Sequence, residues 1–353
     1  MKSIFFKTIT ELKNTYGDSY VKKCSELMDN DDLFSVTSLT AAVNQKDLVP
    51  GRIKALKIFD EDGISTTDFA IEYKDGSVSL VKNGQRGLDS TNRPEDDKRS
   101  IVKFNTTHLK QTDSLVADDF QNTRPFGTQS YDEMVQKFMI EKFHSMTQNN
   151  EATIEYQRVG ALVGKVLDSD GTVILDLHEH FGITPETDDL DLTSGDTKKQ
   201  IRAIKKKSKQ ALKINNVTRW VALCGSQFFD ELELAQDVKE SLVRTKDAES
   251  LREDNDVLGF ASVKWEEYDA FVGDTRFLAE DEALLIPVVP GLCLTRFAPA
   301  DYSETVNTVG VPHYAQAEAK RMNRGFDLEC QSNPISIITV PLAVRRIKLK
   351  ATK

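Results

Sequence analysis

"SYDEMVQKFMIEKFHSMTQNNEATIEYQRVGALV", from Ser130 to Val163, decides the fold because it predicts one unusually long helix. Ser130 and Glu133 have the spacing of a capping box, which marks a helix start. The apolar residues behind it recur at helical intervals, namely Val135, Phe138, Met139, Phe143 and Met146. At ~1.5 Å per residue, a helix that reaches Val163 is roughly 50 Å long. We expect a structural spine whose apolar stripe packs against a sheet rather than lining a cofactor pocket.

The next stretch, "GKVLDSDGTVILDLHEHFG", gathers acids and histidines and raises the hypothesis of a metal site. An EF-hand loop needs acidic ligands at positions 1, 3 and 5, glycine at 6 and glutamate at 12. Counted from Asp168, Asp170 and Glu179 fall at the third and twelfth positions, but Thr172 is fifth and Gly171 is fourth. The β-branched run after Gly171 favours a strand, and Asp-Gly between apolar runs favours a hairpin. The pattern therefore favours a turn followed by a strand.

His178 and His180 would share one face of such a strand and could bind zinc. Zinc needs three or four ligands, and no further Cys or His lies nearby in the sequence. The turn-and-strand interpretation is favoured over a metal site. A metal-dependent hydrolase that uses His178, His180 and nearby acids remains the enzyme alternative.

The composition is typical of a soluble globular chain. It has 353 residues, 39% apolar and 29% charged, which is enough for one elaborate domain or two to three smaller ones. No stretch approaches the ~20 apolar residues of a membrane helix, so we expect no membrane span. Lys7 interrupts the apolar start, which argues against a secretory signal and predicts synthesis in the cytoplasm.

The cysteines and the net charge exclude several classes of function. The four cysteines lie far apart without a CxxC pair, and buried thiols are expected at Cys24, Cys224, Cys293 and Cys330. The net charge of −10 argues against tight wrapping around nucleic acid, which requires basic residues to neutralise phosphates.

One basic run, Lys205 to Lys209, is a candidate nucleic-acid patch. The residues around it place an apolar stripe on one helical face, consisting of Ile201, Ile204, Ser208, Ala211 and Leu212. The lysines then lie on the opposite face. A solvated helix face is therefore favoured over a binding patch.

Before the spine helix, the chain predicts an arm and a projecting loop. Residues 1 to about 50 indicate short amphipathic helices that end at Pro50-Gly51. Phe69, Ile71 and Tyr73 alternate with other residues, Asp75-Gly76 predicts a turn, and the alternation resumes after it, so a hairpin is expected. The polar run that follows, through Ser100, cannot bury enough surface to offset its ordering entropy.

After the spine helix, the chain predicts a compact domain of mixed helices and strands. A strand at 217–225 precedes a helix at 226–243 capped by Ser226, and the basic helix precedes both. Further strands are expected within 259–271, 282–289 and 292–300. The C-terminal segment predicts two strands hinged at Asn333-Pro334, because proline limits strand pairing.

Catalytic signatures are weak. No phosphate loop or GxSxG elbow is spelled, and the five histidines lack a convincing nucleophile signature nearby. The acid pairs Asp188-Asp189 and Glu266-Glu267 could serve acid/base work, although such pairs usually lie on solvated surface.

Several of these stretches, taken in order, resemble the phage major capsid protein E family, which contains the lambda-type capsid protein. They are "SLTAAVNQKDLVPGRIKALKIFDEDGISTTDFAIEYKDGSVSLV", "RPFG", "ATIEYQRVGALVGKVLDSDGTVILDLHEHFGI", "VALCGSQFFDEL", "FAPADYSETVNTVGVPHYAQ" and "LECQSNPISIITVP". Each motif alone is weak evidence for the family, but the occurrence of all of them in the family's order is specific. The resemblance extends from about Ser38 to about Arg346.

The resemblance implies the α+β Hong Kong 97-type fold of tailed-phage capsid proteins. It implies an N-terminal arm over 1–50, an extended loop with a β-hairpin over 51–125, and a peripheral domain with the spine helix over 126–195. An axial domain over 196–310 follows, and C-terminal strands over 311–353 return to the peripheral domain. The implied function is a structural subunit that forms pentamers and hexamers of an icosahedral shell around the genome, without catalysis, cofactor or metal.

The resemblance also implies partners and a location. The chain would associate with itself and with scaffold, maturation protease, decoration and portal proteins, and would contact packaged double-stranded DNA only weakly. It would assemble in the host cytoplasm and reside in the virion. Some members of the fold crosslink a loop lysine to a neighbour's asparagine, for which Lys74 or Lys82 and Asn333 are candidates here, although this branch is not typified by it. A nanocompartment shell that encloses a cargo enzyme is the alternative with the same fold.

Overall fold

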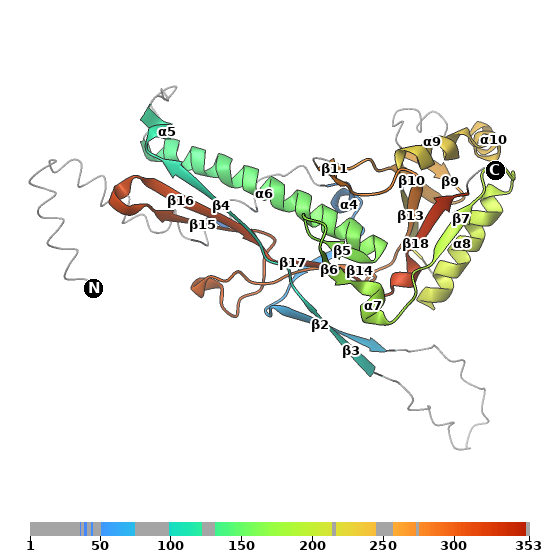
Figure 1. Ribbon diagram of the computed structural model, residues 1–353, viewed down its shortest axis with the longest axis horizontal. Coiled ribbons are helices and arrows are strands. Elements are labelled where there is room, and N and C mark those ends of the chain that lie inside the picture. Colours follow the sequence, from blue (N-terminus) through green and yellow to red (C-terminus); the bar gives the residue numbers. More distant parts are fainter. Residues whose placement is uncertain are drawn as a thin grey trace, which may run out of the picture. The chain divides into compact units, whose positions relative to one another are not determined.

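A computed structural model describes residues 36, 39, 40, 44, 51–74, 99–121, 131–213, 217–244, 257–272 and 275–350 (Figure 1). The chain divides into two compact units, each assembled from three separate segments. Unit 1 comprises Met1–Val49, His108–Asn150 and Ala298–Asn333. Unit 2 comprises Pro50–Thr107, Glu151–Phe297 and Pro334–Lys353.

Helix α6 (Tyr131–Val163) is the predicted spine, and its 33 residues confirm the expected length. Its first part belongs to unit 1 and the rest to unit 2. Gly164 follows the last helical residue and terminates the helix, because its φ of +98° is a left-handed conformation that favours glycine. The Gly164 N–H donates to the Gly160 carbonyl oxygen (2.8 Å), which closes the last turn.

The sheet of unit 1 is three-stranded and antiparallel, in the order β15-β16-β4. Its strands are β4 (Leu109–Val116), β15 (Tyr314–Ala319) and β16 (Gly325–Ser332), and the short helix α5 (Asp118–Gln121) follows β4. Figure 1 shows the first part of α6 running beside these strands. Two 3-10 turns, η2 (Ser303–Thr305) and η3 (Arg321–Asn323), lie in the connections.

The core of unit 1 lies between α6 and one face of this sheet. The predicted apolar stripe is buried there, because Val135, Met139, Phe143 and Met146 are at most 5% exposed and pack with Leu115. Other members of this core are Leu39, Ala315, Leu328 and Cys330. The expectation that the stripe packs against a sheet is confirmed.

The main sheet of unit 2 has six strands in the order β7-β18-β13-β8-β10-β9. Its strands are β7 (Thr187–Leu190), β8 (Arg219–Cys224), β9 (Val257–Phe260), β10 (Val263–Glu267), β13 (Glu282–Val288) and β18 (Arg345–Leu349). The pairs β7–β18 and β8–β10 are parallel, and the other three pairs are antiparallel. Figure 1 places the helices α8 (Thr197–Leu212), α9 (Ser226–Leu234) and α10 (Gln236–Arg244) around this sheet.

Both faces of this sheet are buried, in two separate cores. Ala222 and Leu285 face a core that includes residues of α8, α9 and α10. Their chain neighbours Leu223 and Leu284 face a second core that includes residues of the last part of α6. Successive strand residues point to opposite faces, so strands buried on both faces have continuous apolar sequences.

Smaller elements complete unit 2. A three-stranded sheet has the order β1-β14-β17, and three two-stranded ribbons pair β2 with β3, β5 with β6 and β11 with β12. The strands are β1 (Asp60–Gly63), β2 (Asp68–Lys74), β3 (Arg99–Asn105), β5 (Lys165–Leu167), β6 (Val173–Asp176), β11 (Phe271–Val272), β12 (Thr275–Arg276), β14 (Cys293–Phe297) and β17 (Pro334–Ile338). The short helices are α4 (Arg52–Ala55), α7 (Leu177–Phe181) and η4 (Pro341–Ala343).

Three local expectations need correction. The predicted helix at 226–243 is two helices, because Ala235 between them has an extended ψ of 135°, and Ser226 is the first helical residue rather than a side-chain cap. Strand β2 pairs with β3, whereas the expected partner after Asp75-Gly76 lies outside the described residues. The C-terminal segment hinges at Asn333 as predicted but contains three strands rather than two.

Two expectations from composition concern the cysteines and membrane spans. Cys224, Cys293 and Cys330 are buried free thiols, as predicted, and Cys24 lies outside the described part of the chain. Within that part, none of the helices combines the length and the apolarity needed to cross a membrane.

Candidate functional site

The acidic turn of the candidate calcium loop is a hairpin turn whose carboxylates bond to their own loop. Strands β5 and β6 flank it and pair antiparallel, which confirms the predicted hairpin. The Asp168 carboxylate accepts the Ser169 N–H at 2.7 Å, and Asp170 Oδ1 accepts the N–H and the hydroxyl of Thr172 at 2.8 and 2.7 Å. Asp170 and Thr172 are exposed, so the acids stabilise the turn at the surface of unit 2.

The histidines do not share a strand face, because β6 ends at Asp176. The Asp176 carboxylate accepts the backbone N–H groups of His178 and Glu179 (3.0 and 3.1 Å) and thereby caps α7. Helical residues two apart point in different directions. His178 lies against Gly164, whereas the His180 ring stacks on Phe104 with centroids 5.6 Å apart. The strand geometry behind the zinc hypothesis is therefore wrong.

Burial affects His178 further. It lowers the pKa of the His178 imidazole, and the nearby Asp176 carboxylate opposes that effect only in part. Among the described residues, no group of three or more His, Cys, Asp and Glu side chains is placed to hold a metal ion.

The acid pairs contribute to structural ion pairs rather than to an open site. Asp188 is buried and accepts from Arg345 Nε (2.7 Å) and Lys207 Nζ (2.6 Å). Burial would raise the pKa of Asp188, but the hydrogen bonds from Arg345 and Lys207 outweigh it and lower that pKa below its ordinary value. Glu266 is also buried, and its Oε2 accepts a hydrogen bond from Arg52 Nε at 2.8 Å.

The basic helix α8 has the apolar stripe that the sequence predicts, with Ile201 and Ile204 buried. Its lysines are less free than expected. Lys205 Nζ donates to the carbonyl oxygen of Ala261 (3.0 Å) and lies 5.1 Å from the centre of the Trp220 ring. Lys205 and Lys207 thus make contacts within unit 2, and the expectation of a purely solvated face needs that correction.

The crosslinking hypothesis lacks a free asparagine amide. Asn333 is 4% exposed, its Nδ2 donates to the Pro299 carbonyl oxygen (3.1 Å), and its Oδ1 lies 2.7 Å from His108 Nδ1. Lys82 lies outside the described residues, and of Lys74 only the backbone is described. The internal bonds of Asn333 do not favour a bond to another subunit.

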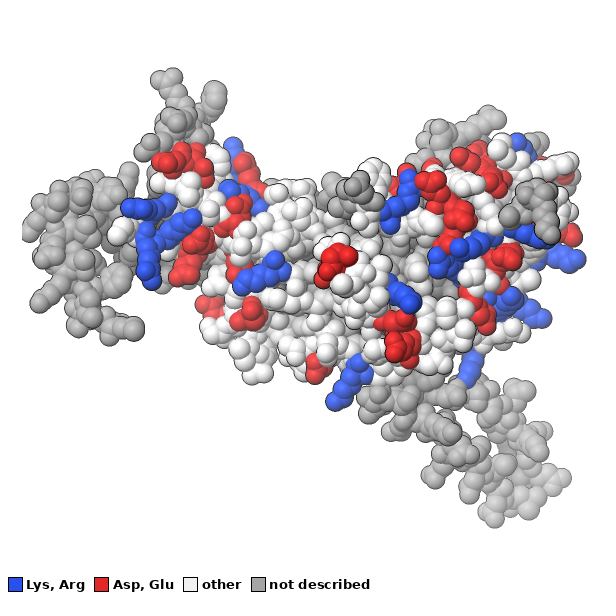
Figure 2. Space-filling view, viewed as in Figure 1, with Lys and Arg blue, Asp and Glu red and all other residues white. Residues whose placement is uncertain are grey.

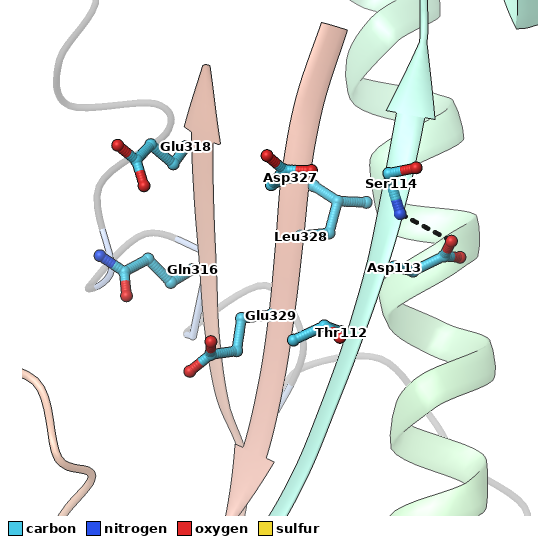
Figure 3. Close-up of a pocket in the computed structure, with 8 residues that line it drawn as sticks. All are labelled: Thr112, Asp113, Ser114, Gln316, Glu318, Asp327, Leu328 and Glu329. Atoms are coloured by element: carbon cyan, nitrogen blue, oxygen red, sulfur yellow. Dashed lines mark hydrogen bonds between the residues drawn. The ribbon is translucent and has the colours of Figure 1, made fainter. Parts of the chain in front are cut away.

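The face of the unit 1 sheet that points away from α6 is polar and hollowed. A cavity of about 520 Å³ lies there, and its outward-facing lining comes from Thr112, Gln316, Glu318, Asp327 and Glu329. In Figure 3, Asp113 points toward α6, where Lys142 bonds it at 2.9 Å, while Gln316 and Glu318 project from the other side. We call this surface the polar sheet face.

Ion pairs balance much of the acidic charge on the polar sheet face. Lys110 pairs with Glu329 at 2.7 Å, and Lys320 pairs with Asp327 at 3.3 Å. Figure 2 shows the wider pattern, in which the described acidic and basic residues alternate in small groups over the visible face. Such a surface favours contacts that depend on several pairs of opposite charge rather than on one dominant field.

A second hollow lies in unit 2 beside α7, and we call it the α7 groove. Its volume is about 700 Å³. The half-buried apolar side chains that line it are Val102, Phe181, Ile183, Val340, Pro341 and Leu342. Glu179, His180 and Lys213 stand among its remaining lining residues. Because these residues come from β3, α7, α8 and the η4 region, no single sequence motif predicts the groove.

The described residues present a long helix, a sheet with one buried face, a sheet with two buried faces and two surface hollows. The putative capsid protein of a prophage of Escherichia coli CFT073 has a similar fold, with a TM-score of 0.56 at 14% identity. The similarity covers 89% of this chain and 99% of that chain. The fold is the Hong Kong 97-type fold of tailed-phage capsid proteins.

Sequence comparisons identify the family. The model of the family described as phage major capsid protein E matches residues 35–349. The major capsid protein of Pseudomonas phage KPP10 is 26% identical over 338 residues, 88% of this chain and 95% of the relative. That of Salmonella phage Felix O1 (isolate Felix O1-VT1) is 26% identical over 161 residues, 45% of this chain, and the match spans only 43% of the relative's length. The chain belongs to the phage major capsid protein E family.

Proposed function

We propose that this chain is the major structural subunit of a tailed bacteriophage or prophage shell. In this proposal, copies form pentamers and hexamers that build an icosahedral shell around the genome. The observation that carries it is the family match over residues 35–349 together with the capsid fold of the described residues. The family is structural, and we extend this to the absence of catalysis in this chain.

The parts of the chain are assigned roles within the same proposal. Residues 1–50 act as an arm, 51–125 as an extended loop, 126–195 as the peripheral domain and 196–310 as the axial domain, while 311–353 return to the peripheral domain. Leu39 supports an anchored arm, because it is 6% exposed and belongs to the unit 1 core. Two hydrogen bonds support it further. Asn44 Nδ2 donates to the His313 carbonyl oxygen at 2.8 Å, and the Ala315 N–H donates to the Thr40 hydroxyl at 3.2 Å.

The proposed partners follow from the proposed role. The chain would associate with itself, with a scaffold, a maturation protease, a decoration protein and a portal, and would reside in the virion after assembly in the host cytoplasm. A net charge of −10 supports weak contact with packaged DNA, because tight contact with phosphates requires basic residues.

Two alternative functions are less well supported. The hydrolase hypothesis required His178 and His180 on one face, and α7 separates them. A nanocompartment shell would share the fold, but the family match is to phage capsid proteins.

Negative-stain microscopy of the purified protein tests the proposal, with the chain expressed alone and together with its neighbouring genes. Closed shells or flat rings are the expected result. The variant Leu234→Ser, at an exposed position of α9 outside both hollows, should give the same particles and serves as the matched control. A chain that remains monomeric in both expressions and at high concentration would overturn the proposal. Stoichiometric zinc in the purified protein would favour the hydrolase instead.

A further inference from the structure

Phe271 is a large aromatic side chain that unit 2 leaves in solvent. It lies on β11 and is 63% exposed. The base of the ribbon is fixed, because Phe271 pairs with Arg276 across the two strands. The Arg276 guanidinium in turn bonds Asp269 at 3.2 Å and Glu280 at 2.6 Å. The protein therefore holds an exposed aromatic ring on an anchored ribbon, and aromatic residues, Phe among them, are enriched at the cores of protein interfaces.

Two apolar residues later in the same segment, Phe277 and Leu278, are packed, which sets Phe271 apart from them. The Phe277 ring lies against Tyr156 of α6 with centroids 4.9 Å apart. Leu278 is only 4% exposed. Because Phe277 and Leu278 pack against unit 2, Phe271 is the exposed exception among these three residues.

The α7 groove offers apolar walls and ample room for such a ring. Its volume of about 700 Å³ falls within the range of roughly 300–1,000 Å³ that ligand pockets occupy. The wall from α7 is braced, because His180 stacks on Phe104 and the Phe181 ring lies 6.1 Å from Phe104. The wall from η4 is braced by Ser208 of α8, whose hydroxyl donates to the Ala343 carbonyl oxygen. The groove is therefore shaped by unit 2 before any partner arrives.

The ring and the groove cannot meet within one copy. Both belong to unit 2, and Figure 1 shows β11 and α7 on opposite sides of the last part of α6. A projecting group on one side and its receptor on the other make a heterologous contact between identical copies. Such contacts repeat from copy to copy and close into a ring where the rotation permits.

We propose that Phe271 of one copy inserts into the α7 groove of the next copy around a capsomer ring. The inference rests on the proposed function, which requires copies of this chain to form rings. A second copy is the occupant because each copy carries both halves of the contact on opposite sides. Burial of a phenylalanine ring removes up to ~150–250 Å² of surface from water, which suits an anchor at the centre of an interface.

A disulfide trap tests the contact directly. The double variant Phe271→Cys with Leu342→Cys is assembled into particles, oxidised mildly and run on a non-reducing denaturing gel. The expected result is a ladder of linked chains that ends at the ring size. All variants of the trap also carry Cys24→Ser, because Cys24 lies outside the described residues. Each single variant should then run as a monomer, because Cys224, Cys293 and Cys330 are buried.

The other outcomes of the trap separate the inference from the proposed function. Particles that form normally but yield only monomers on the gel would overturn the inference and leave the capsid assignment intact. A ladder that stops at dimers would indicate a two-fold contact and would also contradict the proposed contact around a ring. Absence of assembly in the wild-type protein would instead count against the proposed function.

Two variants of the contact supply an independent measurement. Phe271→Ser should raise the protein concentration needed for ring formation by at least about tenfold, the change expected when an anchor residue is lost. Ala211→Trp, which adds bulk to the groove lining, should have the same effect. The matched control is Leu234→Ser, since Leu234 is equally exposed at 65% but lies on α9 and outside the contact. Thermal unfolding checks that each variant folds, and ring formation by Phe271→Ser at the wild-type concentration would contradict the proposal.

Discussion

The two main sheets of this protein bury their side chains in opposite ways. In the six-stranded sheet of unit 2, the adjacent residues Leu284 and Leu285 point to opposite faces, and each is at most 1% exposed. In the three-stranded sheet of unit 1, Leu115 is fully buried against α6, whereas Thr112 on the polar sheet face is exposed. The six-stranded sheet is buried on both faces, whereas the three-stranded sheet has one buried face and one face exposed to solvent.

This difference determines where each unit can contact a partner. A sheet covered on both faces offers no face to a neighbour, so contacts of unit 2 depend on elements outside the sheet, and we propose the β11–β12 ribbon and the α7 groove for this role. A sheet with one free face can use that face itself, and the polar sheet face carries charged groups for it. The comparison predicts different responses to mutation in the two units.

The largest effect is expected at the edge of the unit 2 sheet, for Asp188→Asn. Asp188 on β7 and Arg345 on β18 form a buried ion pair at 2.7 Å. Arg345 also bonds Glu186 at 2.8 Å, but Glu186 is exposed, so loss of Asp188 leaves the buried guanidinium only partly compensated. The expected loss of unfolding free energy is ~3–5 kcal/mol. Chemical denaturation at pH 7 measures it.

The same pair predicts a pH dependence with a definite sign. Because the pKa of Asp188 is lowered in the folded state, its contribution is complete above the ordinary aspartate pKa of about 3.9. The contribution is lost as the pH falls through the lower folded pKa. Asp188→Asn should therefore flatten the acid limb of the stability curve, and an unchanged acid limb would contradict the assignment.

The second prediction addresses the two-faced sheet itself. Leu284→Ala and Leu285→Ala should each cost ~2–5 kcal/mol, because each creates a cavity in one of two cores. In unit 1, Leu115→Ala should cost a similar amount, but Thr112→Ala should stay within about 0.5 kcal/mol. Denaturant titration of the four variants measures the pattern. Tolerance of either leucine variant in unit 2 would break the comparison.

The third prediction concerns the residue at which α6 ends in unit 2. Gly164→Ala should cost clearly more than the ~1–2 kcal/mol of left-handed backbone strain, since the residue has a φ of +98° and an added Cβ would also clash with the His178 ring. Gly171→Ala is the matched control, with a φ of +83° and no atom within 4 Å of an added Cβ. Its cost should be limited to backbone strain of ~1–2 kcal/mol. Equal melting temperatures for the two variants would show that the His178 contact is unimportant.

The smallest effect is expected at Glu155, a buried carboxyl of α6 in unit 2. Burial raises the pKa of Glu155, although its Oε1 accepts the Ile53 N–H at 2.7 Å. The folded state therefore binds this proton more tightly, and its stability falls as the pH rises from about the ordinary glutamate value toward the folded pKa. Glu155→Gln keeps an acceptor for Ile53 and should remove this slope, with a change within about 1 kcal/mol at pH 8. A slope that persists in the variant would place its origin elsewhere.

The sequence predicted best where burial dictates the pattern. The strand within 217–225 and that within 282–289 were found because residues buried on both faces form continuous apolar runs, as in β8 and β13. The spine helix was found because its stripe repeats over many turns. The helical break at Ala235 and the capping role of Asp176 were missed, because both depend on single backbone angles or hydrogen bonds.

Candidate contact surfaces were harder to predict than the elements that carry them. The α7 groove is lined by residues from four distant segments, so only the folded chain brings them together. The exposure of Phe271 could not be read from its sequence either, because Phe277 and Leu278 belong to the same segment and are packed. The ordered resemblance to capsid proteins was visible, because it depends on chain order rather than on side-chain geometry.

The mass of the assembled species tests the central claim most directly. Mass photometry of the protein, expressed with its neighbouring genes, should show species at five or six times the chain mass of 39.6 kDa, together with much larger shells. Phe271→Ser should shift this distribution toward single chains, whereas Leu234→Ser should not. A single population at 39.6 kDa for the wild-type protein at every concentration would contradict the capsid assignment.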